Sequence, residues 1–248
     1  MRVDHLTKTF DKRTAIENLS FEIREKEFVT LVGPSGCGKS TSLRIISGLV
    51  RPTSGTVQTR GSEVRGPIPD AAMVFQSPVL LPWRRSVENI LFTAEMRGMA
   101  PDPYRPRAEE LIRLAGLEGF ERSYPHELSG GMQQRVALAR TLAIDPEILF
   151  MDEPLSSLDA LTRERLQNLI LDIGKTRRIT TVLVTHSIEE AVFLGRKIII
   201  LSRRPGRILQ IVDNPGATSI EYRQSDHFFK QCIHLRELLK GEVNGTET

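Results

Sequence analysis

Apolar and polar positions alternate along the chain in two periods, one typical of strands and one typical of helices. Apolar runs rich in β-branched residues and bounded by charged turns predict strands at 3–10, 15–23, 28–32, 56–59, 72–75, 148–151 and 181–185. Apolar residues spaced three and four apart predict helices at 41–49, 107–115, 160–177, 188–194 and 226–240. Strands that alternate with helices in this way indicate an α/β fold.

Some segments add detail to this alternation. The short turn between the first two strands predicts antiparallel pairing, and a hairpin is predicted between 197–201 and 207–212 about the turn Arg204, Pro205 and Gly206. Residues 86–145 are predicted to be largely helical. We therefore expect a single domain over 1–248, with a core at 1–75 and 146–212, a helical subdomain at 76–145 and a helical extension at 213–248. Residues 241–248 are expected to be a frayed tail.

The composition is that of an ordinary globular protein, with 40% hydrophobic and 26% charged residues in 248. A formal net charge of +3 is a mild excess that does not indicate a nucleic-acid partner. No apolar run approaches the roughly 20 residues of a membrane span, and residues 1–10 lack the apolar core of a signal peptide. The two cysteines, Cys37 and Cys232, form no disulfide framework and suit a reducing cytosol.

Residues 33–40 read G-x-x-x-x-G-K-S, the phosphate-binding loop, between a predicted strand and a predicted helix. The residues of the loop are Gly33, Pro34, Ser35, Gly36, Cys37, Gly38, Lys39 and Ser40. Its glycines let backbone N–H groups surround an anion, and the helix N-terminus adds a positive dipole end. Lys39 is expected to contact the β- and γ-phosphates, and the Ser40 hydroxyl to ligate Mg²⁺. The alternative is a glycine turn that happens to precede a helix, which this context disfavours.

Two carboxylates follow the apolar run at 148–151, and a histidine follows the run at 181–185. In a P-loop protein, Asp152 is the expected Mg²⁺ partner, and Glu153 is placed to activate a water aimed at the γ-phosphate. A solvated strand end is the alternative, which the four apolar residues before Asp152 oppose. His186 is expected to bond the γ-phosphate or to hold Glu153, unless it is an ordinary core or surface histidine.

Three further features each have two interpretations. Ser129, Gly130 and Gly131 open a predicted helix and form either a second anion site or an ordinary capped helix start. Phe10 ends the first predicted strand, where position alone favours a core residue over a ring that stacks on adenine. Residues 79–83 are apolar in a predicted loop, and either mark a partner surface or lie buried under neighbouring helices.

Taken together, these motifs closely resemble the ATP-binding subunits of ABC transporters, over residues 1–212. In order, the matched elements are Phe10 as the adenine-stacking aromatic, Walker A at 33–40 with Thr41 beside it, Gln76 of the Q-loop, the signature at 128–133 with Gln133, Walker B at 148–152, the catalytic Glu153, the D-loop at 157–159 with Asp159, and the switch His186. The resemblance reverses the positional preference for Phe10. It implies an α/β P-loop NTPase core with a mixed sheet, an N-terminal antiparallel β subdomain and an inserted α-helical subdomain.

A narrower resemblance is to bacterial importers of the nitrate, sulfonate and taurine group. It depends on residues 80–83, 124–127, 185–191 and 202–207, and Ser187 departs from the Asp that members usually carry. The resemblance implies import of a small anionic solute through transmembrane permease subunits, with an extracytoplasmic solute-binding protein acting indirectly. It places the chain peripherally on the cytoplasmic face of the inner membrane.

The family also implies how the site works. Two copies, or one copy and an equivalent ATPase partner, bind head to tail, so that Lys39 of one and Ser129 and Gly130 of the other hold the same ATP. Ser40, Asp152 and Gln76 hold Mg²⁺, and Glu153 is the base. A rival interpretation is a soluble ABC-type ATPase that acts on DNA or a protein assembly, but the segment 41–127 lacks the heptads of a long coiled coil. A scaffold without turnover is opposed by the presence of Glu153 and His186.

Overall fold

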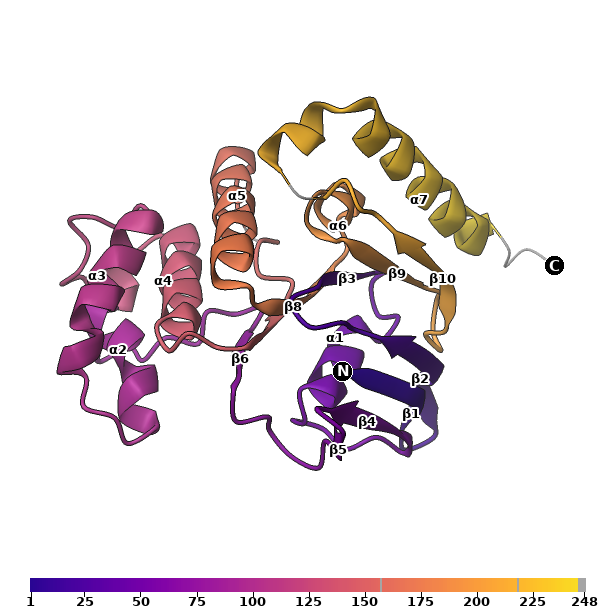
Figure 1. Cartoon of the computed structure of the whole chain (residues 1–248), viewed down its shortest axis with the longest axis horizontal. Coiled ribbons are helices and arrows are strands. Elements are labelled where there is room, and N and C mark those ends of the chain that lie inside the picture. The colour runs from indigo at the N-terminus through magenta and orange to yellow at the C-terminus, as the bar shows by residue number, and fades with distance from the viewer. Residues whose placement is uncertain (157, 218, 245–248) are drawn as a thin grey trace.

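Two sheets organise the computed structural model, which describes residues 1–156, 158–217 and 219–244 (Figure 1). The smaller sheet has the order β2-β1-β4-β5, with all neighbours antiparallel. Its strands are β1 (Arg2–Phe10), β2 (Arg13–Glu22), β4 (Ser54–Thr59) and β5 (Ser62–Glu63). The predicted antiparallel pairing of the first two strands is confirmed. The short strand β5, which pairs with β4, was not predicted from the sequence.

The larger sheet is mixed and has the order β10-β9-β3-β8-β7-β6. Its strands are β3 (Phe28–Val32), β6 (Ala71–Val74), β7 (Ile148–Asp152), β8 (Thr180–Thr185), β9 (Lys197–Leu201) and β10 (Ile208–Asp213). All neighbours are parallel except β10, which forms the predicted hairpin with β9. Both faces of the central strands are covered, and this explains their continuous apolar sequences.

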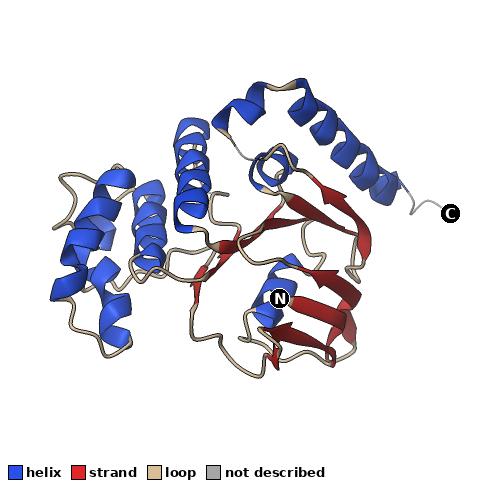
Figure 2. Cartoon of the chain, in the orientation of Figure 1, coloured by secondary structure: helices blue, strands red, loops and turns tan. Residues whose placement is uncertain are grey.

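Seven α-helices surround the sheets among the described residues (Figure 2). They are α1 (Lys39–Ile46), α2 (Ser86–Met96), α3 (Arg105–Leu114), α4 (Gly130–Leu142), α5 (Ala160–Arg177), α6 (Ile188–Leu194) and α7 (Asp226–Asn244), with short 3₁₀ turns at Asp102–Tyr104, Pro125–Glu127 and Ile220–Gln224. Helix α1 ends three residues earlier than predicted, since Gly48 adopts a left-handed φ of 82°. The 3₁₀ turn at Ile220–Gln224 was not predicted, because it lacks an apolar period.

Alternate residues of the central strands belong to two separate hydrophobic cores. On β7, Phe150 packs with α1 and the small sheet, whereas Leu149 and Met151 pack with α5, α6 and α7. The predicted apolar face of the last helix is confirmed, since Phe228, Cys232 and Leu235 are buried and α7 packs on α6. Burial of this face fixes α7 against the core.

Helices α2, α3 and α4 form a group apart from α1 and the small sheet (Figure 1). Their contacts come from buried aliphatic residues, among them Ile90, Leu111 and Val136. The predicted division of the chain into core, helical subdomain and extension remains a prediction. No helix in the described part of the chain is long and apolar enough to span a bilayer.

Candidate active site

The phosphate-binding loop connects β3 to α1, as the motif predicts. Gly38 precedes the helix with a φ of 101°, and an ideal Cβ there would approach the Ala15 carbonyl oxygen to 2.8 Å, so both conformation and space require glycine. The Lys39 side chain is 4% exposed, and its Nζ donates to the carbonyl oxygens of Gly33 and Pro34, both at 2.9 Å. The lysine therefore lies over the loop, with its charge beside the backbone that would surround an anion.

The thiol of Cys37 points away from that anion site. Cys37 is 1% exposed, and an ideal Cβ on Gly33 would lie 3.0 Å from its Sγ. Burial is the main cause that raises the pKa of this thiol, against the lowering effect of Lys39. Cys37 is thus a packed residue beneath the loop, and only its backbone belongs to the phosphate-binding surface.

Ser40 and Asp152 meet at the end of the central strands. Ser40 Oγ donates to Asp152 Oδ1 at 2.6 Å, and the Asp152 side chain is 2% exposed at the end of β7. Arg44 Nη2 lies 3.8 Å from the other carboxylate oxygen. This contact of Arg44 was missed by the sequence analysis, although its place one helical turn after Ser40 could have indicated it. Two oxygen ligands and a nearby cation therefore share one position beside the loop.

Glu153 brings three distant segments together. It adopts a φ of 46°, and its backbone N–H donates to Val184 on β8 at 2.9 Å. Its Oε2 lies 2.9 Å from His186 Nδ1, and its Oε1 lies 3.9 Å from Lys39 Nζ. Of the three sequence interpretations of His186, the structure shows the contact with Glu153. The carboxylate is 17% exposed, so it is open to a water while its orientation is held from one side.

The residues predicted to contact the base and the metal lie at the ends of two strands that belong to different sheets. Phe10 ends β1 with 46% exposure, and Lys8 Nζ lies 4.9 Å above its ring. The ring is therefore not a core residue, because β1 ends at a charged turn with nothing to cover it. Gln76 follows β6 and is exposed, while the carbonyl before it, on Phe75, accepts from Gln134 on α4. Thr41 lies in the first turn of α1.

The glycine pair at the start of α4 is not brought to the phosphate loop within this chain (Figure 1). Ser129 caps the helix by accepting from the Met132 N–H at 3.3 Å, and Gln133 Nε2 donates to the Pro125 carbonyl at 2.9 Å. Gly130 is exposed, and an ideal Cβ on Gly131 would lie 3.1 Å from Leu158 Cδ2. The exposed N-terminus of α4 therefore faces solvent in the single chain.

Asp159 caps α5, and its carboxylate accepts from the Thr162 N–H at 2.9 Å. Hydrogen bonds from Thr162 hold the pKa of Asp159 below its ordinary value. Ser157, predicted as part of the same loop, lies outside the described residues. Leu158, the neighbour of Asp159, and Thr162, its bonding partner, both lie beside Gly131 at the start of α4.

The sequence analysis also missed a contact between the β9–β10 turn and the phosphate loop. Gly206 in the β9–β10 turn lies against the Cys37 carbonyl, where an ideal Cβ would overlap the oxygen. The Pro-Gly pair indicates a turn, but nothing in the sequence indicates what that turn contacts. The loop is therefore supported by a segment more than 160 residues away in the chain.

Comparison with known proteins gives a consistent result. Residues 16–156 match the family model described as ABC transporter. The chain is 47% identical, over 98% of its length and 92% of the relative's, to an uncharacterized ABC transporter ATP-binding protein of Methanocaldococcus jannaschii. It is 46% identical to the taurine import ATP-binding protein TauB of Jannaschia sp. strain CCS1, covering 78% of this chain and 72% of that protein.

A solved structure agrees with these relatives. The ATP-binding cassette MJ0796, solved as a dimer in a post-hydrolysis state bound to ADP and Pi, superposes with a TM-score of 0.77 at 34% identity. The match covers 86% of this chain and 97% of that one. The predicted P-loop fold with a mixed sheet is therefore confirmed.

Proposed function

This chain belongs to the ABC transporter family, and from that membership we propose that it is the ATP-hydrolysing subunit of an importer for a small anionic solute of the nitrate, sulfonate or taurine type. Relatives named as taurine import ATP-binding proteins share 44–49% identity with it. The observation that carries the proposal is the contact of Glu153 with both His186 and Lys39, beside Ser40 and Asp152.

ATP binding follows from the loop and its surroundings. The backbone N–H groups at 35–38, the dipole of α1 and the charge of Lys39 bind the phosphates. The first turn of α1 adds Thr41, and the exposed ring of Phe10 stacks on the adenine. The ammonium of Lys39 is already within hydrogen-bond distance of the loop backbone, so it reaches the phosphates without a rearrangement of the chain.

The residues beside the loop fit a magnesium ion. Ser40 Oγ and Asp152 Oδ1 are hard oxygen ligands at 2.6 Å from each other, and Gln76 offers an amide oxygen. Among the described residues no group of three His, Cys, Asp or Glu side chains forms a site for a metal held by protein alone. A site with few protein oxygen ligands suits Mg²⁺, because this ion keeps waters and substrate phosphate oxygens as its other ligands. When bound, Mg²⁺ neutralises charge on the β- and γ-phosphates.

Hydrolysis is an in-line attack of water on the γ-phosphorus. The new bond forms from the water oxygen, the bond to the bridging oxygen of ADP breaks, and the proton of the water passes to Glu153. His186 Nδ1 holds the Glu153 carboxylate in the orientation that this transfer needs. Lys39 stabilises the charge that develops on the transferred group.

The remaining predicted residues require a second chain. Ser129, Gly130, Gly131 and Gln133 lie at the start of α4, and Asp159 caps α5, whereas the phosphate loop precedes α1. A head-to-tail dimer brings the residues at the starts of α4 and α5 to the ATP of the neighbouring copy, or of an equivalent ATPase partner. The dimeric neighbour structures support this arrangement.

The proposed function also implies membrane partners, and the exposed apolar loop before α2 is the surface that would contact them. Val79 and Trp83 are 61% and 70% exposed in the loop before α2, which supports a contact with transmembrane permease subunits. The protein then lies peripherally on the cytoplasmic face of the membrane, and an extracytoplasmic solute-binding protein acts through the permease. Co-purification with a multispanning membrane protein supports this role, whereas co-purification with DNA contradicts it.

The substitution Glu153→Gln tests the catalytic assignment. We expect ATP affinity to be kept and turnover to fall by about 10²–10⁴-fold, because the amide cannot accept the proton. ATP binding by fluorescence titration and phosphate release are the measurements, with accumulation of an ATP-bound dimer by size-exclusion chromatography. Glu237→Gln on the exposed face of α7 is the matched control. Phosphate release at the original rate would remove Glu153 from the role of base.

A further inference from the structure

A cavity of about 280 Å³ lies at the end of the large sheet opposite the candidate active site. Phe28 begins β3 and Ile179 precedes β8, whereas the active-site residues follow the other ends of these strands. Phe28, Ile179, Leu171 and Leu194 form an apolar floor, and each is less than 8% exposed. We call this space the basic cavity.

Four cations from three segments surround that floor. They are Lys26 in the turn before β3, Lys175 and Arg178 at the end of α5, and Arg196 before β9. The lining contains no acidic residue, and within the described part of the chain none of the four side chains forms an ion pair or a hydrogen bond. The cations are exposed while the floor is buried, so the cavity has a charged rim and an apolar base.

Neither Glu221 nor the helix dipole accounts for this rim. Glu221 feels the charge of Lys175, but its pKa is lowered first by hydrogen bonds at its own backbone and with Ser219. Lys175 complements the negative end of α5, but Lys26 and Arg196 belong to other elements. At least two cations therefore have no local structural role that explains their position.

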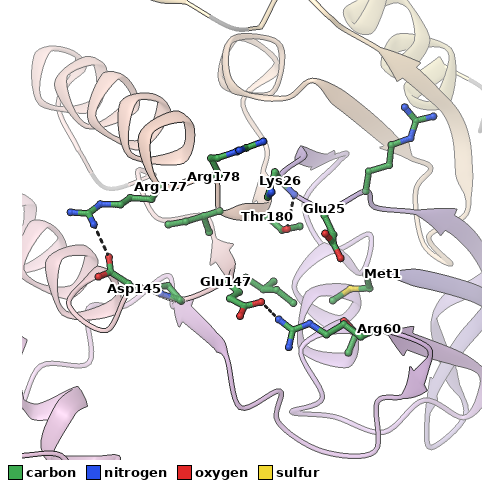
Figure 3. A pocket seen from close by; sticks show the side chains of 14 residues that line it. Met1, Glu25, Lys26, Arg60, Asp145, Glu147, Arg177, Arg178 and Thr180 are labelled. Carbon is green, nitrogen blue, oxygen red and sulfur yellow. Dashed lines mark hydrogen bonds and ion pairs between the residues drawn. The ribbon is translucent and has the colours of Figure 1, made fainter.

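The neighbouring cavity provides a contrast. It measures about 450 Å³ and shares Lys26 and Arg178 with the basic cavity (Figure 3). There Asp145 pairs with Arg177 at 3.6 Å and Glu147 pairs with Arg60. In Figure 3 the side chain of Arg178 extends toward Lys26 and away from these acids. The neighbouring cavity therefore has acids that pair with some of its cations, whereas the lining of the basic cavity contains cations and no acid.

We propose that the basic cavity binds a small organic anion with an apolar body and a tetrahedral oxyanion head, such as a sulfonate or a phosphate monoester. The apolar body lies on Phe28 and Leu171, and the head accepts hydrogen bonds from Arg178, Arg196 and the two lysines. Gly174 in the last turn of α5 keeps the space open, because it has no side chain and an ideal Cβ there would lie 3.9 Å from Phe28 Cδ2. This site is distinct from the ATP site, and its test does not depend on hydrolysis.

Isothermal titration calorimetry of the full chain without nucleotide tests this proposal, with hexanesulfonate as the probe. Sulfate and 1-hexanol are compared at the same ionic strength. Sulfate has the oxyanion head without the apolar body, and 1-hexanol has the apolar body without the charged head. We expect one saturable site, with hexanesulfonate bound about tenfold tighter than either comparison ligand. Lys39→Ala separates this binding from anions held by the phosphate loop, and is expected to leave the hexanesulfonate affinity unchanged.

Substitutions locate the site. Lys175→Ala and Arg196→Ala remove exposed side chains that form no hydrogen bond or ion pair with the described residues, and each is expected to weaken hexanesulfonate binding by about tenfold. Arg122→Ala, an exposed cation on the helical group, is the matched control. Gly174→Leu fills the cavity and is expected to abolish binding. Equal affinity for hexanesulfonate and 1-hexanol, or wild-type affinity in both alanine variants, overturns the proposal.

Discussion

The turn between β9 and β10 holds the phosphate loop through one glycine, and Gly206→Ala tests this support. The Gly206 N–H donates to the Ala15 carbonyl at 2.9 Å, and its own carbonyl accepts from the Glu17 N–H at 2.9 Å, so the turn is fixed to β2. An ideal Cβ on Gly206 would overlap the Cys37 carbonyl oxygen, well inside the 3.0 Å below which real Cβ contacts are essentially never found. Either the turn or the loop must move.

The expected magnitude follows from this overlap. Overpacking at a well-packed position costs about 1–3 kcal/mol, and the hydrogen bonds to β2 direct the displacement into the loop. A displacement of about 1 Å in a positioned catalytic loop costs about 100-fold in rate. We therefore expect kcat/KM for ATP to fall by about 100-fold and the melting temperature to fall by several degrees.

Phosphate release at varied ATP concentration and thermal melting are the two assays. Gly66→Ala is the matched control, because an added Cβ there meets no atom within 4 Å, and both quantities should stay at their original values. If Gly206→Ala hydrolyses ATP and melts as the unaltered protein does, the turn does not hold the loop and the reasoning is refuted.

Three further predictions concern other parts of the molecule. Tyr222→Phe removes the hydroxyl that donates to Asn214 Oδ1 at 2.5 Å in the core, and should lower the free energy of unfolding by about 1–3 kcal/mol in urea; an unchanged midpoint contradicts this. Burial raises the pKa of the Cys232 thiol from 9.0 to about 11, so the folded protein keeps a proton that the unfolded chain releases. Stability should therefore decline as the pH rises from 9.0 to about 11, and Cys232→Ala should flatten that decline in melts across this range; an unaltered slope speaks against it. Trp83, 70% exposed, should change its fluorescence when the cognate membrane subunit binds, and an unchanged spectrum with binding shown independently places the contact elsewhere.

The sequence predicts the elements around the site well because their signals are local. Strands β3, β7 and β8 are buried on both faces, so each is a continuous apolar run. The predicted bounds of α5 agree with the structure, since Asp159 caps its start. The glycine loop is recognisable because its function depends on residue types at fixed spacing.

Long-range contacts could not be predicted in the same way. The pairing of Glu153 with His186 was one of three interpretations, since nothing near either residue specifies the partner. Position alone placed Phe10 in the core, because a single aromatic residue at a strand end gives no sign of what covers it. The support from Gly206 and the rim of the basic cavity depend on segments that only the tertiary fold brings together.

The order of strands in the large sheet has a consequence for synthesis of the chain. Strand β8 lies between β3, which leads into the phosphate loop, and β7, which ends in Asp152. A ribosome that has made only the first 152 residues has produced two strands that cannot pair with each other in the final register. Ser40 and Asp152 therefore meet only after the polypeptide through Thr185 has emerged, and the nascent protein acquires its nucleotide site late in translation.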